Sequence, residues 1–241
     1  MHPRYLASTW SCALLVVAAT LLAGGVEVKP EALTAVQILD RVSKAYASCR
    51  TYRDSGSVKT VFVRTDGKWT ERRPFATAFV RPDRFRFEYR EKRGDDDELR
   101  YIVWRQGKDV RTWWDLNPGI EKPSSLGLAL AGATGVSGGS AHTVPALLLP
   151  GEVGGRLLTS ITDARRMGDA KLGETDCFRV QGTYVNAPVT LWIEKKSFLV
   201  RRMDSRNEFK DFRTEGTTVY DSTVNGEIPD ELLRFDPPSK P

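Results

Sequence analysis

The stretch from Pro123 to Gly151 lacks charged side chains altogether. It holds no Asp, Glu, Lys or Arg in 29 residues, although the chain's 67 charged residues in 241 would place about eight there (67/241 × 29). Gly, Pro and Ser interrupt it too often for a membrane span, which needs about 20 continuous apolar residues. Such a segment must either be covered by the rest of the protein or itself cover an apolar surface.

Histidine and cysteine are also scarce, which excludes several kinds of site. Beyond the first 25 residues only His142, Cys49 and Cys177 remain, whereas a zinc site usually takes three or four such ligands. No G-x-x-x-x-G-K-[ST] phosphate loop occurs either. We therefore expect no metal and no cofactor.

The charge of the chain is mildly positive and evenly mixed. The formal net charge is +5, and removing residues 1–25 with Arg4 leaves +4. This is not the concentrated basic patch of a nucleic-acid-binding protein, so we expect no nucleic-acid partner. A basic excess can attract anionic lipid head groups.

The first 25 residues are typical of a secretory signal peptide. Arg4 gives a positive start, Trp10 to Leu22 is apolar, and Ala23-Gly24-Gly25 offers small residues for cleavage. The alternative is an uncleaved membrane anchor. With the signal removed, residues 26–241 are long enough for one large β domain.

Export leaves two alternatives open for Cys49 and Cys177. An oxidising compartment favours a disulfide between them. However, strand alternation that turns Phe178 and Val180 inward would turn Cys177 outward. The other alternative is two separate thiols that pack as small hydrophobic side chains.

The periodicity of apolar residues predicts one helix followed by many strands. Residues 32–49 repeat Val36, Leu39, Val42, Tyr46 and Cys49 at helical spacing. Period-two segments then predict strands at 52–65, 68–80, 84–92, 98–106, 109–115, 163–172, 175–185, 188–195, 198–206, 208–214 and 216–224. Ile228 to Phe235 is expected to be a short helical turn or an edge strand.

These elements predict a mainly β fold with α elements. The simplest arrangement is a half-open antiparallel β-barrel of about eleven strands, preceded by the N-terminal helix. The uncharged segment 123–151 is then a helical lid inserted in mid-sheet. Ser124 would cap a helix over 125–132, and Pro145 would lie in the first turn of another over 144–149.

The lid contains a pattern that is also typical of a hydrolase. Gly135-Val136-Ser137-Gly138-Gly139 matches G-x-S-x-G, and His142 follows. That nucleophile motif needs a strand before it and a histidine far downstream, and neither is present. We interpret the segment as a flexible hinge between two lid helices and expect no enzymatic activity.

An apolar trough beneath the lid is the predicted binding site. Its walls would carry Phe62, Phe79, Phe85, Phe87, Trp104 and Leu191. The lid would turn Leu126, Leu128, Leu130, Leu147, Leu148 and Leu149 toward it. The alternative is that all these side chains simply complete a hydrophobic core.

Several segments of the mature chain resemble the LolA/LolB-like family of outer-membrane lipoprotein-sorting proteins. They are Ala35–Asp40 with Ala45-Tyr46, Tyr52–Gly56, Phe79–Glu88, Gly173–Val180, Val189–Glu194 and Ile228–Phe235. The resemblance implies an unclosed eleven-stranded barrel, a helical lid and a cavity that shields lipoprotein acyl chains. It also implies that an arginine latches the lid.

Taken together, the sequence predicts a periplasmic carrier that holds a lipid or a lipoprotein acyl chain and exchanges it with an inner- or outer-membrane protein. A different function is also consistent with the same fold. It could be an envelope-stress sensor or regulatory scaffold module that binds a protein partner.

Overall fold

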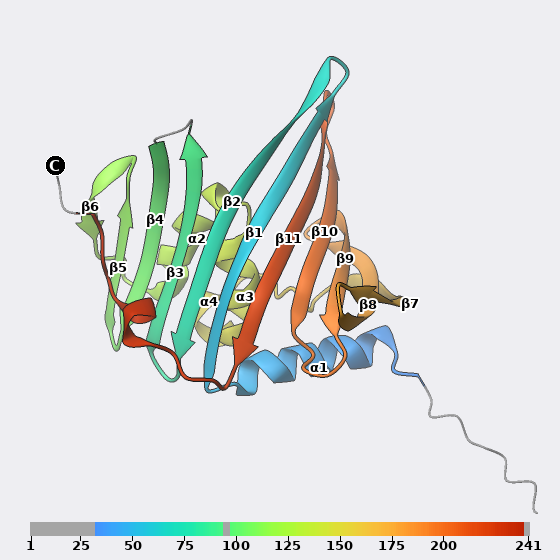
Figure 1. Cartoon of the computed structure of the whole chain (residues 1–241), viewed down its shortest axis with the longest axis horizontal. Coiled ribbons are helices and arrows are strands. Elements are labelled where there is room, and N and C mark those ends of the chain that lie inside the picture. The colour runs from blue at the N-terminus through green and yellow to red at the C-terminus, as the bar shows by residue number, and fades with distance from the viewer. Residues whose placement is uncertain (1–31, 94–96, 239–241) are drawn as a thin grey trace, which may run out of the picture. The chain divides into compact units, whose positions relative to one another are not determined.

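The computed structural model describes residues 32–93 and 97–238 (Figure 1). All its elements belong to one compact unit that begins at Leu33. The predicted signal peptide, residues 1–25, lies outside the described residues. Among the described helices, none combines the length and the apolar character needed to cross a membrane.

The predicted first helix is present as α1 (Ala35–Ser48). A capping box fixes its start, because the Thr34 hydroxyl accepts a hydrogen bond from the Gln37 amide and the Gln37 side chain accepts one from the Thr34 amide. Val36, predicted on the buried face, is 71% exposed. Each residue turns the helix by about 100°, so Ala35 takes the buried position and Val36 lies beside it in solvent.

Eleven antiparallel strands form a single sheet. They are β1 (Thr51–Arg64), β2 (Gly67–Val80), β3 (Arg84–Arg93), β4 (Asp97–Gln106), β5 (Asp109–Trp114), β6 (Asn117–Glu121), β7 (Thr162–Leu172), β8 (Thr175–Tyr184), β9 (Ala187–Glu194), β10 (Val200–Glu208) and β11 (Arg213–Val224). The predicted count agrees only because two errors cancel. The short edge strand β6 was missed, and β11 with the turn before it was predicted as two strands, 208–214 and 216–224.

The strand order explains where the helical insertion must lie. The sheet runs β6-β5-β4-β3-β2-β1-β11-β10-β9-β8-β7, so every pair of neighbouring strands is consecutive in the chain except β1 and β11. The two edges, β6 and β7, are also consecutive in the chain. The chain between them must therefore cross from one edge to the other, and it does so as α2 (Leu126–Val136), α3 (Ser140–Leu148) and α4 (Pro150–Val153), which we call the lid helices (Figure 1).

The sheet has one face toward these helices, which we call the inner face, and an opposite outer face. Direct partners in the ladder share a face, and Tyr52 pairs with Phe79, which pairs with Phe85. These rings join one hydrophobic core with α1 and the lid helices. The predicted half-open architecture is confirmed, since β6 and β7 end the sheet without pairing to each other.

The outer face carries a second, smaller core under the C-terminal segment. Ile102, Trp104 and Trp113 pack there against Phe235. The predicted C-terminal turn is present as a 3-10 helix, η1 (Asp230–Leu233), and the Trp104 indole donates a hydrogen bond of 2.7 Å to the Leu233 carbonyl. The prediction that Trp104 lines the inner trough is therefore wrong. In β4 the inner positions belong to Tyr101 and Val103, and alternation turns Trp104 outward.

Candidate functional site

The helix α2 presents one apolar stripe to the sheet. Its start is capped by Ser125, not by the predicted Ser124, because the Ser125 hydroxyl accepts a hydrogen bond of 3.2 Å from the Leu128 amide. Residues at spacings of three and four are buried, namely Leu126, Ala129, Leu130 and Ala133. Leu128 is 58% exposed, so the prediction that it faces inward is wrong. Leu126, Leu128 and Leu130 recur every second residue, and a helix cannot turn all three to one side.

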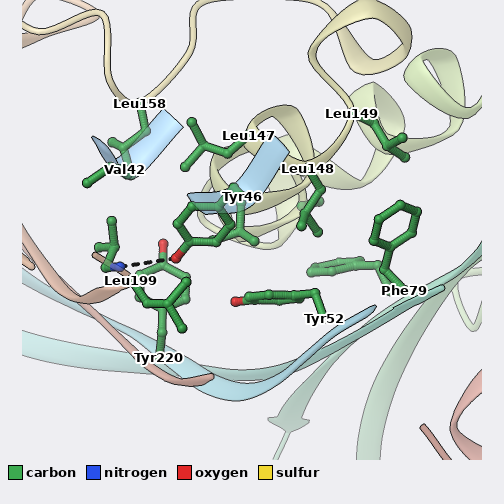
Figure 2. Close-up of a cluster of buried hydrophobic side chains, with 14 of the residues drawn as sticks. Val42, Tyr46, Tyr52, Phe79, Leu147, Leu148, Leu149, Leu158, Leu199 and Tyr220 are labelled. Carbon is green, nitrogen blue, oxygen red and sulfur yellow. Dashed lines mark hydrogen bonds between the residues drawn. The ribbon is translucent and has the colours of Figure 1, made fainter. Parts of the chain in front are cut away.

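The helix α3 is buried along almost its entire length. It begins at Ser140, four residues before the predicted start, so Pro145 lies inside it instead of in its first turn. The Ser137 hydroxyl accepts a hydrogen bond from the Ala141 amide at 3.1 Å and so satisfies a free donor in the first turn. Leu147, Leu148 and Leu149 are buried as predicted (Figure 2).

The glycine-rich turn between α2 and α3 packs against β1 at Gly138, whereas Gly135 and Gly139 have open space beside them, and the flexibility predicted for this segment stays a prediction. Gly138 and Gly139 have φ values of 65° and 90°, which favour glycine. A Cβ atom on Gly138 would lie 3.0 Å from Cγ1 of Val58 on β1. Ser137 is buried and its hydroxyl bonds within the lid, while His142 Nε2 lies 3.1 Å from the Gly154 carbonyl. Each side chain of the hydrolase-like pattern thus has a local structural partner.

The inner face supplies an aromatic floor beneath the lid helices. Phe79, Phe85, Phe87 and Leu191 are fully buried, and they share one cluster with Leu126, Leu130 and Leu147–Leu149. Figure 2 shows the lid leucines on one side and Phe79, Tyr52 and Tyr220 on the other. The predicted lid and trough residues meet, with side chains of the lid packed directly on the floor. Their contact with a ligand stays a prediction.

Phe62 lies on the same strand face but outside this floor. It stacks on Trp69 with 4.7 Å between ring centroids, at the far end of the β1–β2 hairpin, and is only half-buried. It therefore does not line the covered part of the trough.

A surface hollow opens beside the lid at the β6 edge of the sheet. Its volume is about 290 Å³. Its lining includes Tyr101, Thr112, Glu121, Leu128, Ala129 and Gly132. A Cβ on Gly132 would come within 3.1 Å of the Tyr101 hydroxyl, so glycine lets α2 approach β4 closely here. The hollow therefore lies on the surface where α2 meets β4, β5 and β6.

Arg81 ties α3 to α1 and to the sheet. Its guanidinium donates hydrogen bonds to the carbonyls of Cys49 (2.7 Å), Tyr46 (3.3 Å) and Leu148 (2.9 Å). These carbonyls lie at the C-terminal ends of α1 and α3, where the helix dipole favours a cation. The sequence alone does not identify Arg81, because the chain has many arginines. Only the fold places the C-terminal ends of α1 and α3 beside its guanidinium.

Replacing Arg81 with Lys should loosen α3. A lysine amine cannot reproduce the planar fork that reaches three carbonyls, so one or more of them would be left unpaired. We expect a loss of about 1–3 kcal/mol in unfolding free energy and faster amide hydrogen exchange in α3 than in β9. Equal exchange of the α3 amides in the wild type and the variant would show that these hydrogen bonds of Arg81 do not hold α3 in place.

Polar side chains lie beneath the lid, within the apolar floor. The Thr143 and Tyr220 hydroxyls are 2.9 Å apart and link α3 to β11, and the Tyr46 hydroxyl accepts a hydrogen bond from the Val200 amide (Figure 2). Asp54 is buried between β1 and β2, and it accepts hydrogen bonds from the Tyr52 hydroxyl at 2.6 Å and the Thr77 amide at 2.8 Å. Burial raises the pKa of Asp54 to about 6, although both hydrogen bonds oppose the rise.

Asp54 and Tyr220 were missed at the level of the sequence. A carboxylate in the middle of an apolar strand face is a signal that could have identified Asp54, because a charged residue at an inward position of a period-two pattern breaks the alternation.

The two cysteines are separate buried thiols in the structure. The Cys49 thiol donates to the Tyr46 carbonyl, at the end of α1. Cys177 pairs in register with Glu194, one position from the inward-facing pair of Phe178 and Ile193. Of the two alternatives, the structure therefore has small hydrophobic side chains and not a disulfide. Burial raises the pKa of both thiols.

No known family model and no curated protein matches this chain by sequence. Among solved structures, the lipoprotein LppX of Mycobacterium tuberculosis is similar over 81% of this chain and 97% of its own, with 11% identity and a TM-score of 0.46. A LolA superfamily protein from Nitrosomonas europaea is similar over 85% and 99%, with 10% identity and a TM-score of 0.31.

The MucB chain of the Pseudomonas aeruginosa MucA/MucB complex is similar over 84% of this chain but only 61% of that chain, with 12% identity and a TM-score of 0.42. All three likenesses concern the fold alone. The LolA-like architecture that the resemblance implied is present in the topology of this chain: an unclosed sheet of eleven strands, an N-terminal helix and a helical insertion.

Proposed function

We propose that this protein is an exported, non-enzymatic binding protein that shields an acyl chain of a lipid or lipoprotein between the lid helices and the inner face. The observation that carries the proposal is the lid itself. Its segment from Pro123 to Gly151 is uncharged and covers an aromatic floor. Few polar contacts attach it to the sheet, among them Arg81 to Leu148, Thr143 to Tyr220 and an ion pair of Arg105 with Glu152 on α4.

The energetics allow such an exchange in either direction. Burying one methylene is worth about 0.8 kcal/mol, so a sixteen-carbon chain gains on the order of 12 kcal/mol against water. An acyl chain inserted between the lid and the floor would replace the apolar contacts between them with apolar contacts to the chain. Because a bilayer offers the chain a similar gain, transfer in either direction is near balance, and small changes in the lid can set its direction.

The periplasm is the compartment that this role requires, and a membrane protein of the inner or outer membrane would supply or receive the lipid. The hollow beside Leu128 offers a route for the chain under α2.

A disulfide that locks the lid to the sheet tests the proposal. A Cβ on Gly138 would lie 3.5 Å from Cβ of Val58, at the short end of the roughly 3.5–4.5 Å that a disulfide allows. In the double variant Val58→Cys, Gly138→Cys we expect the oxidised form to lose binding of a fluorescent fatty acid and of a palmitoylated lipopeptide. Reduction of the same sample should restore binding.

The variants Val58→Cys and Gly138→Cys, each made alone, are the controls, because they contain one half of the double change and cannot form the lock. Binding that is equal in the oxidised and reduced double variant would exclude uptake beneath the lid. If the wild type binds neither probe, yet retains a protein partner from envelope extracts after delipidation, the regulatory alternative replaces the carrier function.

A further inference from the structure

Four aromatic rings form a cluster at the far end of the longest hairpin. Phe62 and Trp69 belong to the β1–β2 hairpin, and Phe209 and Phe212 flank the turn between β10 and β11; we call these four residues the aromatic tip. Phe62 stacks on Trp69 at 4.7 Å, Phe209 stacks on Phe212 at 4.5 Å, and Phe62 lies 6.4 Å from Phe212. Figure 1 shows this hairpin reaching beyond the ends of the other strands, with β10 and β11 beside it.

The aromatic tip is exposed and does not belong to either hydrophobic core. Trp69 is 42% exposed and Phe209 is 52% exposed. The turns that present them are short and polar, since Phe209 and Phe212 close a turn over Lys210-Asp211 through a hydrogen bond of 2.8 Å. Turn ends of this kind normally carry polar side chains, so large rings held there in a fixed stack point to a partner surface.

Positive charge accompanies the rings. The guanidinium of Arg64 lies over Trp69 at 5.2 Å and over Phe212 at 5.8 Å. Segments 59–72 and 206–213 together hold seven Lys or Arg against four Asp or Glu, a net +3 of the chain's total of +5. Trp is enriched at the interface between lipid and water, segments that bind membrane surfaces combine Trp and Phe with Lys and Arg, and the cations attract anionic head groups.

The tip lies on the same strand face as the trough. Phe62 and Trp69 are direct partners on β1 and β2, as are Tyr52 and Phe79 further down the same strands. The contact of the lid with β1 reaches Val58, and the strand continues four residues beyond it to Phe62. A surface bound at the tip would therefore lie at the uncovered end of the inner face.

We propose that the aromatic tip docks this protein on the surface of a lipid bilayer that contains anionic lipids. Trp69 and Phe209 enter the head-group region, and Arg64, Lys68 and Lys210 contact lipid phosphates. The docking depends only on the aromatic tip, at the turns of the β1–β2 and β10–β11 hairpins. The proposal therefore holds whether or not an acyl chain is taken up beneath the lid.

Co-sedimentation with vesicles of phosphatidylcholine and phosphatidylglycerol tests the docking. The double variant Trp69→Gln, Phe209→Gln should bind these vesicles at least about tenfold more weakly, since each ring removed costs interfacial apolar area. The fold should be unaffected because both side chains are exposed. The triple variant Arg64→Gln, Lys68→Gln, Lys210→Gln should weaken binding to the anionic vesicles and remove most of its salt dependence.

The matched control is Val36→Gln, Leu232→Gln, which removes two exposed hydrophobic side chains, 71% and 41% exposed, on α1 and η1. It should bind vesicles like the wild type. Brominated phosphatidylcholine should quench wild-type tryptophan fluorescence, and the Trp69→Phe variant should lose that quenching while it still binds. Vesicle binding that is unchanged in the tip variant, or a tip variant that loses only self-association or binding to a protein, would overturn the proposal.

Discussion

Replacing Leu130 with Asp should unfold this protein at neutral pH. Leu130 is fully buried and packs in the core formed by the lid helices and the inner face. A carboxylate at this position would have no partner, and an unpaired buried charge costs several kcal/mol in addition to the lost apolar contacts. Because a domain of this kind is stabilised by only about 5–15 kcal/mol, most of that margin would be lost. Thermal denaturation followed by circular dichroism measures the effect.

Leu128→Asp is the matched control, since it makes the same chemical change two residues away. Leu128 is exposed on α2, so the unfolding free energy of the variant should lie within about 0.5 kcal/mol of the wild-type value. Leu128 lies at the rim of the hollow under α2, and a charge there should reduce the uptake of a fluorescent fatty acid. Equal destabilisation by the two substitutions would show that α2 is turned differently from the structure described here.

This pair of leucines illustrates what the sequence could and could not predict. The lack of charge in residues 123–151 was enough to predict an apolar cover, because charges are excluded from a buried interface. Which leucines face the sheet depends on helical geometry, and a spacing of two residues placed Leu128 on the wrong side. For Leu147–Leu149 the prediction of burial agrees with the structure. These three leucines are consecutive, so the prediction did not depend on which side of the helix faces the sheet.

The strands show a similar division. Alternation in the segment Arg84–Arg90 correctly placed Phe85 and Phe87 on the inner face, because their neighbours are charged. Trp104 was assigned to the wrong face since Ile102, Val103 and Trp104 are consecutive apolar residues, and both faces of β4 are covered. The sequence does not show that the C-terminal segment returns to cover the outer face. Arg81 and Tyr220 depend on the same kind of long-range contact.

Two buried carboxylates on opposite faces of the sheet should respond to pH in opposite directions. Burial would raise the pKa of Glu88, but the hydrogen bonds from Arg100 and the charges of Arg86, Arg100 and Arg90 outweigh burial and lower it. Asp54, on the lid side, accepts hydrogen bonds from the Tyr52 hydroxyl and the Thr77 amide, and burial outweighs them and raises its pKa. The two carboxylates differ because arginines surround Glu88, whereas neutral donors bind Asp54.

Asp54→Asn should therefore stabilise the protein, and the gain should depend on pH. The pKa of Asp54 is about 6 in the fold against an ordinary value of 3.8, so the folded state binds the proton more tightly than the unfolded chain does. The wild type is then most stable below pH 3.8 with respect to this group, and loses that stability as pH rises through about 6. A difference of roughly two pKa units corresponds to about 3 kcal/mol. Asparagine carries no charge and can still accept from the Thr77 amide.

Urea denaturation at pH 4, 6 and 8 measures this effect. The difference in unfolding free energy between Asp54→Asn and the wild type should be small at pH 4 and approach about 3 kcal/mol in favour of the variant at pH 8. Glu88→Gln should behave in the opposite way, because its lowered pKa means that the ionised form stabilises the fold. It should cost about 3 kcal/mol at pH 8, since Arg86 and Arg100 lose a buried partner, and cost less as the pH falls below 4.5. If Asp54→Asn destabilised the protein equally at every pH, Asp54 would be a structural hydrogen-bond acceptor alone.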